Sequence, residues 1–173
     1  MESGEKGSLF EGAHRPGHFD GVLTVVNRLF ELVNPTSAVF GKKDAQQLYL
    51  VKEFFANKSN NLKIIEAEII RDEYGLAMSS RNRLLSKSGI NIARNIFQIL
   101  ENTKEHFIQN QDIQQSEDFG KKLFDENAIE YDYLNFVDPK YFETPDSNRE
   151  KLLLITAAYV QGIRLIDNME VIQ

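Results

Sequence analysis

A short turn near the start of the chain carries histidine and arginine just ahead of an apolar pattern with helical spacing. The turn has the sequence Glu11-Gly-Ala-His-Arg-Pro-Gly-His18. Because a helix N-terminus presents unpaired N–H groups and the positive end of its dipole, an anion could bind there beside Arg15 and His18. The alternative is a surface turn with solvated side chains, and the pattern alone leaves both open.

A second cluster, Phe40-Gly-Lys-Lys-Asp44, lies where an expected strand ends and a helix begins. Ligands of open α/β sheets bind beyond the carboxyl ends of the strands. Gly41 would let a ligand approach the backbone, and Lys43 could neutralise a phosphate or carboxylate. Gln47 could reach the same site from the first helical turn. The alternative is an ordinary strand–helix junction with Asp44 as its cap.

The third cluster is the Gly-led segment from Tyr74 to Asn82, which contains Ser79, Ser80 and Arg81. Two hydroxyls can donate to phosphate oxygens, and a guanidinium can bind phosphate through two hydrogen bonds. A hydrogen-bonded turn is the alternative, because serine is common in turns. All three clusters lie near expected strand ends and helix starts, so together they favour a nucleotide or phosphate site.

Two further acidic residues, Glu66 and Glu68, share one face of an expected strand. Spacing alone does not establish a catalytic carboxylate pair, and we expect these side chains to face solvent or form salt bridges. The three histidines are not spaced with acidic residues as metal ligands. We therefore expect no protein-built metal site.

Helices and strands, which must position these clusters, are expected to alternate in the first half of the chain. Apolar periodicity predicts a helix at 19–33, ended by Asn34-Pro35, and a second helix from about Lys43. Apolar and β-branched runs predict strands at 37–40 and 62–70. This alternation is typical of a parallel sheet covered by helices.

The pattern changes after Arg81. Helices are expected at 87–109 and 116–126, and strands at 129–137, 152–160 and 164–167. The inner side of the first of these helices is expected to carry Ile92, Ile96, Ile99, Thr103 and Phe107. Two helices followed by strands indicate a small α+β unit, so we place a domain boundary near Arg81 to Leu84, dividing the chain into 1–82 and 83–173.

The charge balance and the lack of cysteine disfavour or exclude several classes of partner and site. The 173 residues include 20 Lys+Arg and 26 Asp+Glu, for a net charge of −6. This balance disfavours whole-surface attraction to nucleic acid or anionic membranes. The chain has no cysteine, which excludes disulfides, thiolate metal sites and cysteine nucleophiles. No signal-peptide pattern opens the sequence, and its longest apolar run is far short of the ~20 residues of a membrane helix, so we expect a cytoplasmic protein.

Several motifs, in one order and spacing, carry a specific resemblance. They are Glu11-Gly12, Arg15-Pro-Gly-His-Phe19, Gly21-Val22, Thr24-Val-Val26, Leu29-Phe30, Phe40-Gly-Lys-Lys-Asp44, Gln46-Gln-Leu48, Gly75-Leu-Ala-Met-Ser-Ser-Arg-Asn82, Tyr133-Leu134 and Arg164-Leu-Ile-Asp-Asn168. From Phe10 to its end, the chain resembles the C-terminal portion of the pantothenate synthetase (pantoate–β-alanine ligase) family.

The resemblance implies an α/β fold: part of a parallel, Rossmann-like (HUP) nucleotide-binding sheet, followed by a small α+β C-terminal lid domain. It also implies the reaction. The carboxylate of pantoate attacks the α-phosphate of ATP to give pantoyl adenylate and pyrophosphate, and the amine of β-alanine then displaces AMP. Mg²⁺ would accompany ATP, held mainly by phosphate oxygens. The family is usually homodimeric.

Site residues are carried over where the motifs match. For ATP, the resemblance implies contacts from Gly41, Lys42, Lys43, Asp44, Ile70, Met78, Ser79, Ser80 and Arg81. Lys43 would bridge pantoate and the reacting phosphate, while Gln47, Arg15 and His18 would bind pantoate. The implied catalytic residues are Lys43, Ser79, Ser80 and Arg81. Ile70 stands where the family usually has valine against the adenine, which suggests a backbone contact there.

One departure from the family pattern affects the expected activity. The family begins with a nucleotide-binding half whose Met-Gly-Ala-Leu-His-x-Gly-His type signature holds ATP phosphates, and this sequence has no such motif. We therefore expect a fragment or truncated product that binds ATP weakly and catalyses poorly alone. The alternatives are a non-catalytic assembly module and another adenylyl-transferring enzyme. The matches at Gln47 and Arg15–His18 argue against the latter.

Overall fold

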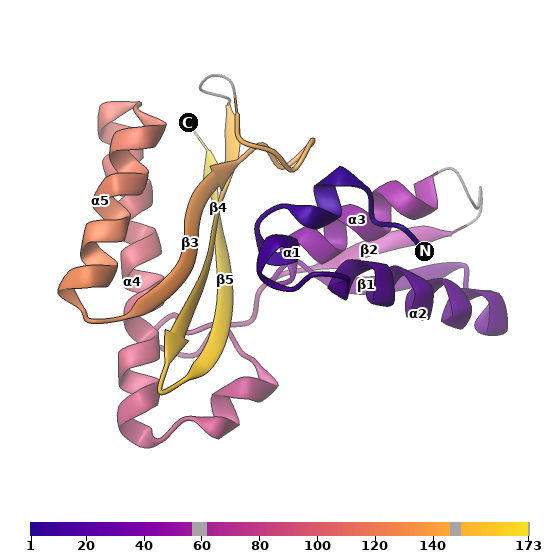
Figure 1. The fold of residues 1–173 in the computed structure, drawn as a ribbon, viewed down its shortest axis with the longest axis horizontal. Helices are drawn as coiled ribbons and strands as arrows, with labels where there is room; N and C mark the ends of the chain where they lie inside the picture. The colour runs from indigo at the N-terminus through magenta and orange to yellow at the C-terminus, as the bar shows by residue number, and fades with distance from the viewer. Residues whose placement is uncertain (57–61, 146–149, 173) are drawn as a thin grey trace. The chain divides into compact units, whose positions relative to one another are not determined.

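The computed structural model describes residues 1–56, 62–145 and 150–172. The chain forms two compact units, Met1–Glu68 and Ile69–Gln173 (Figure 1). None of the helices in the described ranges is both long and apolar enough to cross a membrane.

The division between the units lies earlier than the boundary near Arg81–Leu84 that the sequence pattern indicated. Residues 69–82 group with the second unit because two arginines bond them to its last strand. Arg71 forms an ion pair with Asp167, and the guanidinium of Arg81 donates to a backbone carbonyl of the same strand. Local patterning gives no sign of such long-range bonds.

The first unit is a two-stranded parallel sheet with helices packed against it. Its elements are η1 (Glu5–Ser8), α1 (Glu11–His14), α2 (His18–Val33), β1 (Ser37–Gly41), α3 (Ala45–Ala56) and β2 (Lys63–Ala67). Leu23 of α2 and the α3 residues Val51 and Phe55 form a small buried cluster, against which Phe40 and Ile64 of the two strands pack. The expected helix–strand alternation with parallel pairing is confirmed.

The ends of α2 follow local backbone chemistry. Gly17, with φ of 75°, precedes the first helical residue, and Asn34, with φ of 47°, ends the helix by donating its N–H to the Phe30 carbonyl. Pro35 then prevents continuation. The sequence prediction for this helix is confirmed within one residue.

The strand predicted at 164–167 is longer in the structure, Ile163–Ile172. Two predicted boundaries of the first unit also differ. The second strand ends at Ala67 rather than Ile70, because the Ile70 carbonyl instead accepts the Met78 amide in a separate loop. Helix α3, which follows β1, starts at Ala45 rather than Lys43, because the amide of Asp44 is bonded to the Gly41 carbonyl in the preceding turn.

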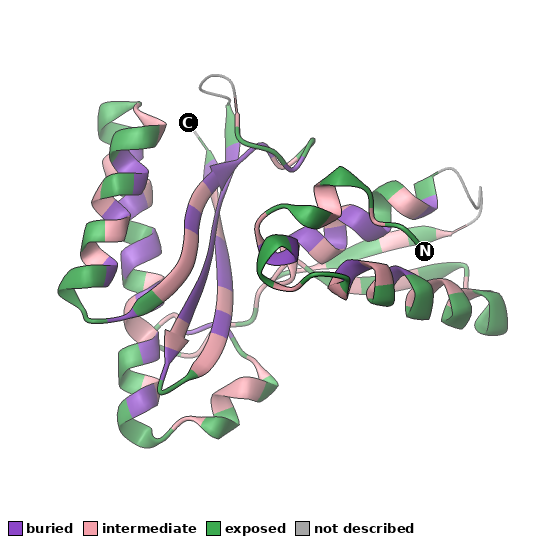
Figure 2. Cartoon of the chain, viewed as in Figure 1, coloured by how far each residue is buried: buried purple, intermediate pink, exposed green. Residues whose placement is uncertain are grey.

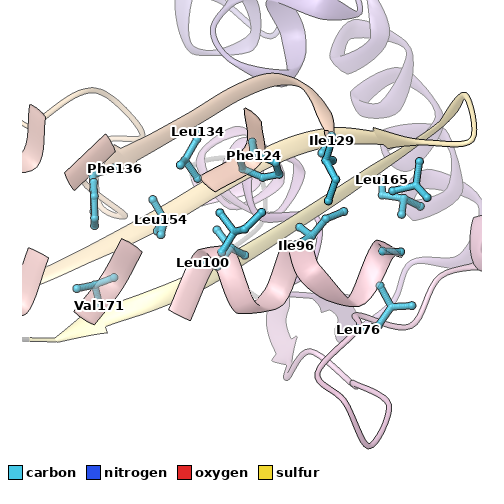
Figure 3. Packing of buried hydrophobic residues seen from close by; sticks show 14 of the residues in the cluster. Leu76, Ile96, Leu100, Phe124, Ile129, Leu134, Phe136, Leu154, Leu165 and Val171 are labelled. Carbon is cyan, nitrogen blue, oxygen red and sulfur yellow. The ribbon is translucent and has the colours of Figure 1, made fainter. Parts of the chain in front are cut away.

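The second unit is a three-stranded antiparallel sheet, ordered β3-β4-β5, packed against two helices. Its elements are η2 (Ser80–Leu84), α4 (Lys87–Asn110), α5 (Ile113–Glu126), β3 (Glu130–Val137), β4 (Lys151–Val160) and β5 (Ile163–Ile172). Figure 3 shows Ile96 and Leu100 of α4 facing Leu154 of β4 and Leu165 of β5. Figure 2 shows β4 as almost wholly buried, as expected for the central strand.

The buried side of α4 confirms most of the predicted inner residues and corrects one. Ile96, Ile99, Thr103 and Phe107 are buried, but Ile92 is 40% exposed. The buried stripe continues toward the N-terminus through Ala93 and Gly89, so Ile92 falls beside it. The next helix, α5, begins at Ile113, ahead of the predicted start, because the Asp112 side chain caps it by accepting the Gln115 amide.

Candidate functional site

In the first unit, a turn links the end of β1 to the start of α3 and contains Gly41–Asp44. The Lys42 amide donates to the Ala67 carbonyl at 2.8 Å, which ties the turn to the neighbouring strand. The Asp44 carbonyl accepts the Leu48 amide at 2.9 Å and so begins the helix. A Cβ at Gly41 would meet no atom within 4 Å. No neighbouring atom therefore blocks approach to the backbone at Gly41.

The Lys42 side chain of this turn already has a partner. Its Nζ lies 2.6 Å from Glu68 Oε1, and Lys52 makes an ion pair of the same length with Glu66. The expectation that these two glutamates form salt bridges is confirmed. A phosphate bound at the turn would compete with Glu68 for the Lys42 ammonium.

The two glutamines of α3 have different roles. Gln46 is buried, and its Oε1 accepts the Glu11 amide while its Nε2 donates to the carbonyls of Lys6 and Leu9. It therefore holds the N-terminal segment against α3. Gln47 lies on the same first turn and is partly exposed. Sequence reasoning missed the structural role of Gln46, because adjacent glutamines carry no sign of which one is buried.

Arg15 and His18 are hydrogen-bonded to each other in the structure. The Arg15 Nη1 donates to His18 Nε2 at 2.9 Å and to Glu11 Oε1 at 3.2 Å. Since guanidinium only donates, His18 accepts through Nε2, which requires its neutral form with the proton on Nδ1. The carboxylate of Glu11 offsets the charge of Arg15 in this state.

In the second unit, the segment 70–82, here called the 70–82 loop, begins as a tight hairpin. The Met78 amide donates to the Ile70 carbonyl at 2.8 Å, and Asp72 Oδ1 accepts the amides of Tyr74 and Leu76, both at 2.9 Å. Gly75 supplies the positive φ of 91° that the tip requires. The hairpin sets where the serines that follow it are placed.

The carboxyl of Asp72 is held ionised by this hairpin. Partial burial raises its pKa, but the hydrogen bonds from the Tyr74 amide, the Arg94 side chain and the Leu76 amide outweigh that effect. The result is a pKa below the ordinary value of 3.8. The carboxylate therefore keeps accepting the loop amides throughout the neutral pH range.

The residues predicted to bind phosphate follow the hairpin on the same loop. Ser79 caps η2 by accepting the Arg81 amide at 3.2 Å, and the Arg81 Nη1 donates to the Arg164 carbonyl at 3.0 Å. Met78, Ser79 and Ser80 line an open hollow of about 500 Å³ together with Asn82 and Arg83, whereas Arg81 is not among its lining residues. The structure thus places Ser79 and Ser80 on this hollow, while the Arg81 guanidinium is bonded to β5.

The predicted site residues fall in both units. Arg15, His18, Gln47 and the turn at 41–44 belong to the first, whereas Ile70 and Met78–Arg81 belong to the second. The Ile70 side chain is 70% exposed, so the described chain does not cover it.

Comparison with known proteins places these residues in a family. The family model described as Pantoate-beta-alanine ligase matches residues 1–170. The chain belongs to this family. Pantoate–β-alanine ligases named pantothenate synthetase include relatives from Cytophaga hutchinsonii, 39% identical over 168 residues, and Marinomonas, 40% identical over 162 residues. These matches cover 95% and 92% of this chain but only 59% and 57% of the relatives.

Solved structures of pantoate–β-alanine ligases share the fold. A pantothenate synthetase from Thermus thermophilus matches 100% of this chain and 63% of its own, with a TM-score of 0.92 at 35% identity. A ligase from Francisella tularensis, solved with β-γ ATP and β-alanine, matches 95% of this chain and 55% of its own, with a TM-score of 0.72 at 30% identity. The α/β fold with a parallel and an antiparallel sheet is therefore that of the family.

Proposed function

We propose that this chain carries part of the site of an ATP-dependent ligase that joins pantoate to β-alanine through a pantoyl-adenylate intermediate. The observation that carries most weight is the 70–82 loop, in which Ser79 caps η2 and Ser80 and Arg81 begin it, within the residues that the family model matches. The Francisella relative, solved with a form of ATP and β-alanine, supports this choice of ligands.

The first step needs two anions to be brought together. A carboxylate oxygen of pantoate attacks the α-phosphorus of ATP, and the bond to the pyrophosphate oxygen breaks. In the proposal, Lys43 lies between the two anions and offsets their repulsion, while Gln47, Arg15 and His18 orient pantoate. Catalysis then comes from positioning and from donors aimed at developing charge.

In the proposal, the 70–82 loop stabilises the negative charge that develops on the leaving pyrophosphate. The hydroxyls of Ser79 and Ser80 donate to phosphate oxygens, and Arg81 adds a guanidinium. In the second step the free amine of β-alanine attacks the acyl carbon. AMP leaves with one of the original carboxylate oxygens, and the nitrogen loses its proton.

Mg²⁺ is proposed to enter the site on the phosphate oxygens of ATP. Among residues 1–56, 62–145 and 150–172, no three His, Asp or Glu side chains gather as a metal site. In the proposal the nucleotide brings the cation, and no protein side chain is assigned to it.

The chain spans 59% and 57% of the length of the two curated relatives named above. We therefore propose that full activity also needs groups from the part of those relatives outside the match, and that the isolated chain is a weak catalyst. By family resemblance, we further propose that the assembled enzyme works in the cytoplasm.

The label-transfer experiment for this function uses pantoate with ¹⁸O in its carboxylate, together with ATP, Mg²⁺ and β-alanine. The proposal predicts AMP that carries one ¹⁸O. Lys43→Met should abolish the transfer, whereas Lys52→Met, which removes only the surface pair with Glu66, should not. Label in inorganic phosphate would instead indicate an acyl phosphate and would refute the adenylate route.

A second candidate, an assembly role through a homodimer, is favoured by exposed apolar side chains of the first unit. Val39 and Ile65 are paired in register on β1 and β2 and are 65% and 38% exposed. Parallel sheets are normally covered on both faces. The α2 residues Val25, Leu29 and Leu32 are exposed as well.

The proposed occupant of this face is a second copy of the chain, because the ligase family is usually dimeric. Light scattering at increasing concentration should show a dimer for the native chain. Val39→Lys should shift the dimer to monomer. Val25→Lys, which changes only α2, tests whether the exposed residues of that helix also belong to the dimer interface. A native chain that stays monomeric at high concentration would exclude this role.

A further inference from the structure

Arg71 clamps the 70–82 loop to strand β5. Its Nη1 and Nη2 donate to the two carboxylate oxygens of Asp167 at 2.6 and 2.9 Å. The same two nitrogens also donate to the carbonyls of Gly75 and Asn168, each at 2.9 Å. All four Nη hydrogens of Arg71 are therefore in use, which leaves none of them for a phosphate. This arginine holds the protein together at this point and is not itself placed to bind the ligand.

The clamp lies in a sheltered environment. The side chains of Arg71 and Asp167 are 19% and 5% exposed, and the ring of Phe97 lies 4.7 Å from the guanidinium carbon. Paired charge-assisted hydrogen bonds of this kind are short and geometrically specific. Lysine cannot reproduce them, because it lacks the planar array of donors.

A second attachment fixes the other end of the loop. Arg81 donates to the Arg164 carbonyl on β5 at 3.0 Å, and Asn82 Nδ2 donates to the Ala77 carbonyl at 3.1 Å. The residues between the two attachments are those whose hydroxyls are proposed to meet phosphate. The backbone that carries these hydroxyls is thus attached to β5 both before and after them.

We infer that Arg71 and Asp167 are positioning residues, which hold Ser79, Ser80 and Arg81 in their binding arrangement before nucleotide arrives. This inference rests on the proposed function for the identity of the ligand, a nucleoside triphosphate. Ordering the loop in advance removes an entropic cost that would otherwise be paid on binding. Loss of the clamp should weaken polyphosphate binding without removing any group that touches the ligand.

The test compares variants of the clamp with a matched ion pair on the same strand. Asp167→Asn removes the charge that Arg71 faces, and Arg71→Lys keeps the charge but loses the paired geometry. The control is Glu170→Gln, which weakens the 3.1 Å pair between Glu170 of β5 and Lys151 of β4 and leaves Arg164, to which the loop is attached, unchanged. All four proteins are compared at a temperature at which each is folded.

Two quantities are measured: hydrogen exchange of the Met78 and Asn82 amides, which are bonded within the loop, and the dissociation constant for ATP with Mg²⁺. Both clamp variants should speed exchange at these amides at least tenfold and weaken ATP binding at least tenfold. The control should leave both within about twofold of the native chain.

The outcomes separate the clamp from the ligase proposal. Loop exchange that is equal in Asp167→Asn and the control would overturn the inference, and Arg71→Lys decides the same question if Asp167→Asn fails to fold. Faster exchange with unchanged ATP affinity would also overturn it. A native chain that binds no ATP counts against the proposed function alone, since loop exchange still decides whether the clamp orders the loop.

Discussion

Replacement of Gly75 by alanine tests whether the 70–82 loop requires both the positive φ and the small size of this glycine. Gly75 has φ of 91°, and a Cβ added there would overlap the ring of Phe97. That ring also supports the Arg71 guanidinium. The substitution should therefore strain the backbone, displace the ring and disturb the clamp together.

The expected cost follows from two effects. An alanine forced into left-handed backbone geometry costs about 1–2 kcal/mol. Overpacking against Phe97 adds about 1–3 kcal/mol. Gly75→Ala should thus lower the free energy of unfolding of the second unit by about 2–5 kcal/mol. Gly21→Ala is the matched control, because Gly21 lies in α2 and its added Cβ would meet nothing within 4 Å; it should stabilise the first unit by about 0.5–1 kcal/mol.

Urea unfolding combined with hydrogen exchange assigns each change to a unit. A double-mutant cycle with Phe97→Ala isolates the steric part, because the cost of Gly75→Ala should fall to about 1–2 kcal/mol once the ring is gone. The reasoning would be refuted by a cost for Gly75→Ala below about 0.5 kcal/mol. A cost that is the same with and without the ring would refute its steric component.

Three further predictions concern the core, the loop charge and the N-terminal segment. Phe124→Ala should cost the second unit about 3–5 kcal/mol in urea unfolding, because Phe124 is 0% exposed in the main core, and a loss below about 1 kcal/mol would contradict this packing. The lowered pKa of Asp72 means that its ionised form stabilises the fold above pH 3.8, the ordinary value, and that this contribution is lost as the pH falls through its folded pKa. The difference in unfolding free energy between the native chain and Asp72→Asn should therefore shrink below about pH 4, and a constant difference would be inconsistent with that pKa. Gln46→Ala should free the segment that Gln46 binds through Lys6, Leu9 and Glu11, and limited proteolysis should then cut that segment faster than in Gln47→Ala.

Local signals in the sequence account for the elements that were predicted well. The boundaries of α2 and α4 follow from apolar spacing and from residues that act locally, such as Asn34-Pro35 and the capping Ser86. The phosphate-loop candidate was recognisable because its hydroxyls and arginine are adjacent in sequence.

Features that depend on distant contacts were not predictable in the same way. The Arg71–Asp167 clamp joins residues 96 positions apart, and it is one reason why the unit boundary lies at Glu68 rather than near Arg81. Gln46 and Gln47 are chemically identical in the sequence, and only the fold shows that Gln46 is buried. The exposed Ile92 shows that apolar spacing alone does not identify which of two neighbouring residues lies in the buried stripe, since the adjacent Ala93 is buried instead.

The most direct test of the proposed chemistry is ATP–pyrophosphate exchange in the absence of β-alanine. Exchange is measured for the chain alone and after addition of the segment of the Cytophaga hutchinsonii relative that lies outside the match. We predict exchange that requires pantoate, rises when the segment is added, and is lost in Lys43→Met but kept in Lys52→Met. Exchange that ignores pantoate, or none under either condition, would contradict the assignment of adenylate chemistry to this site.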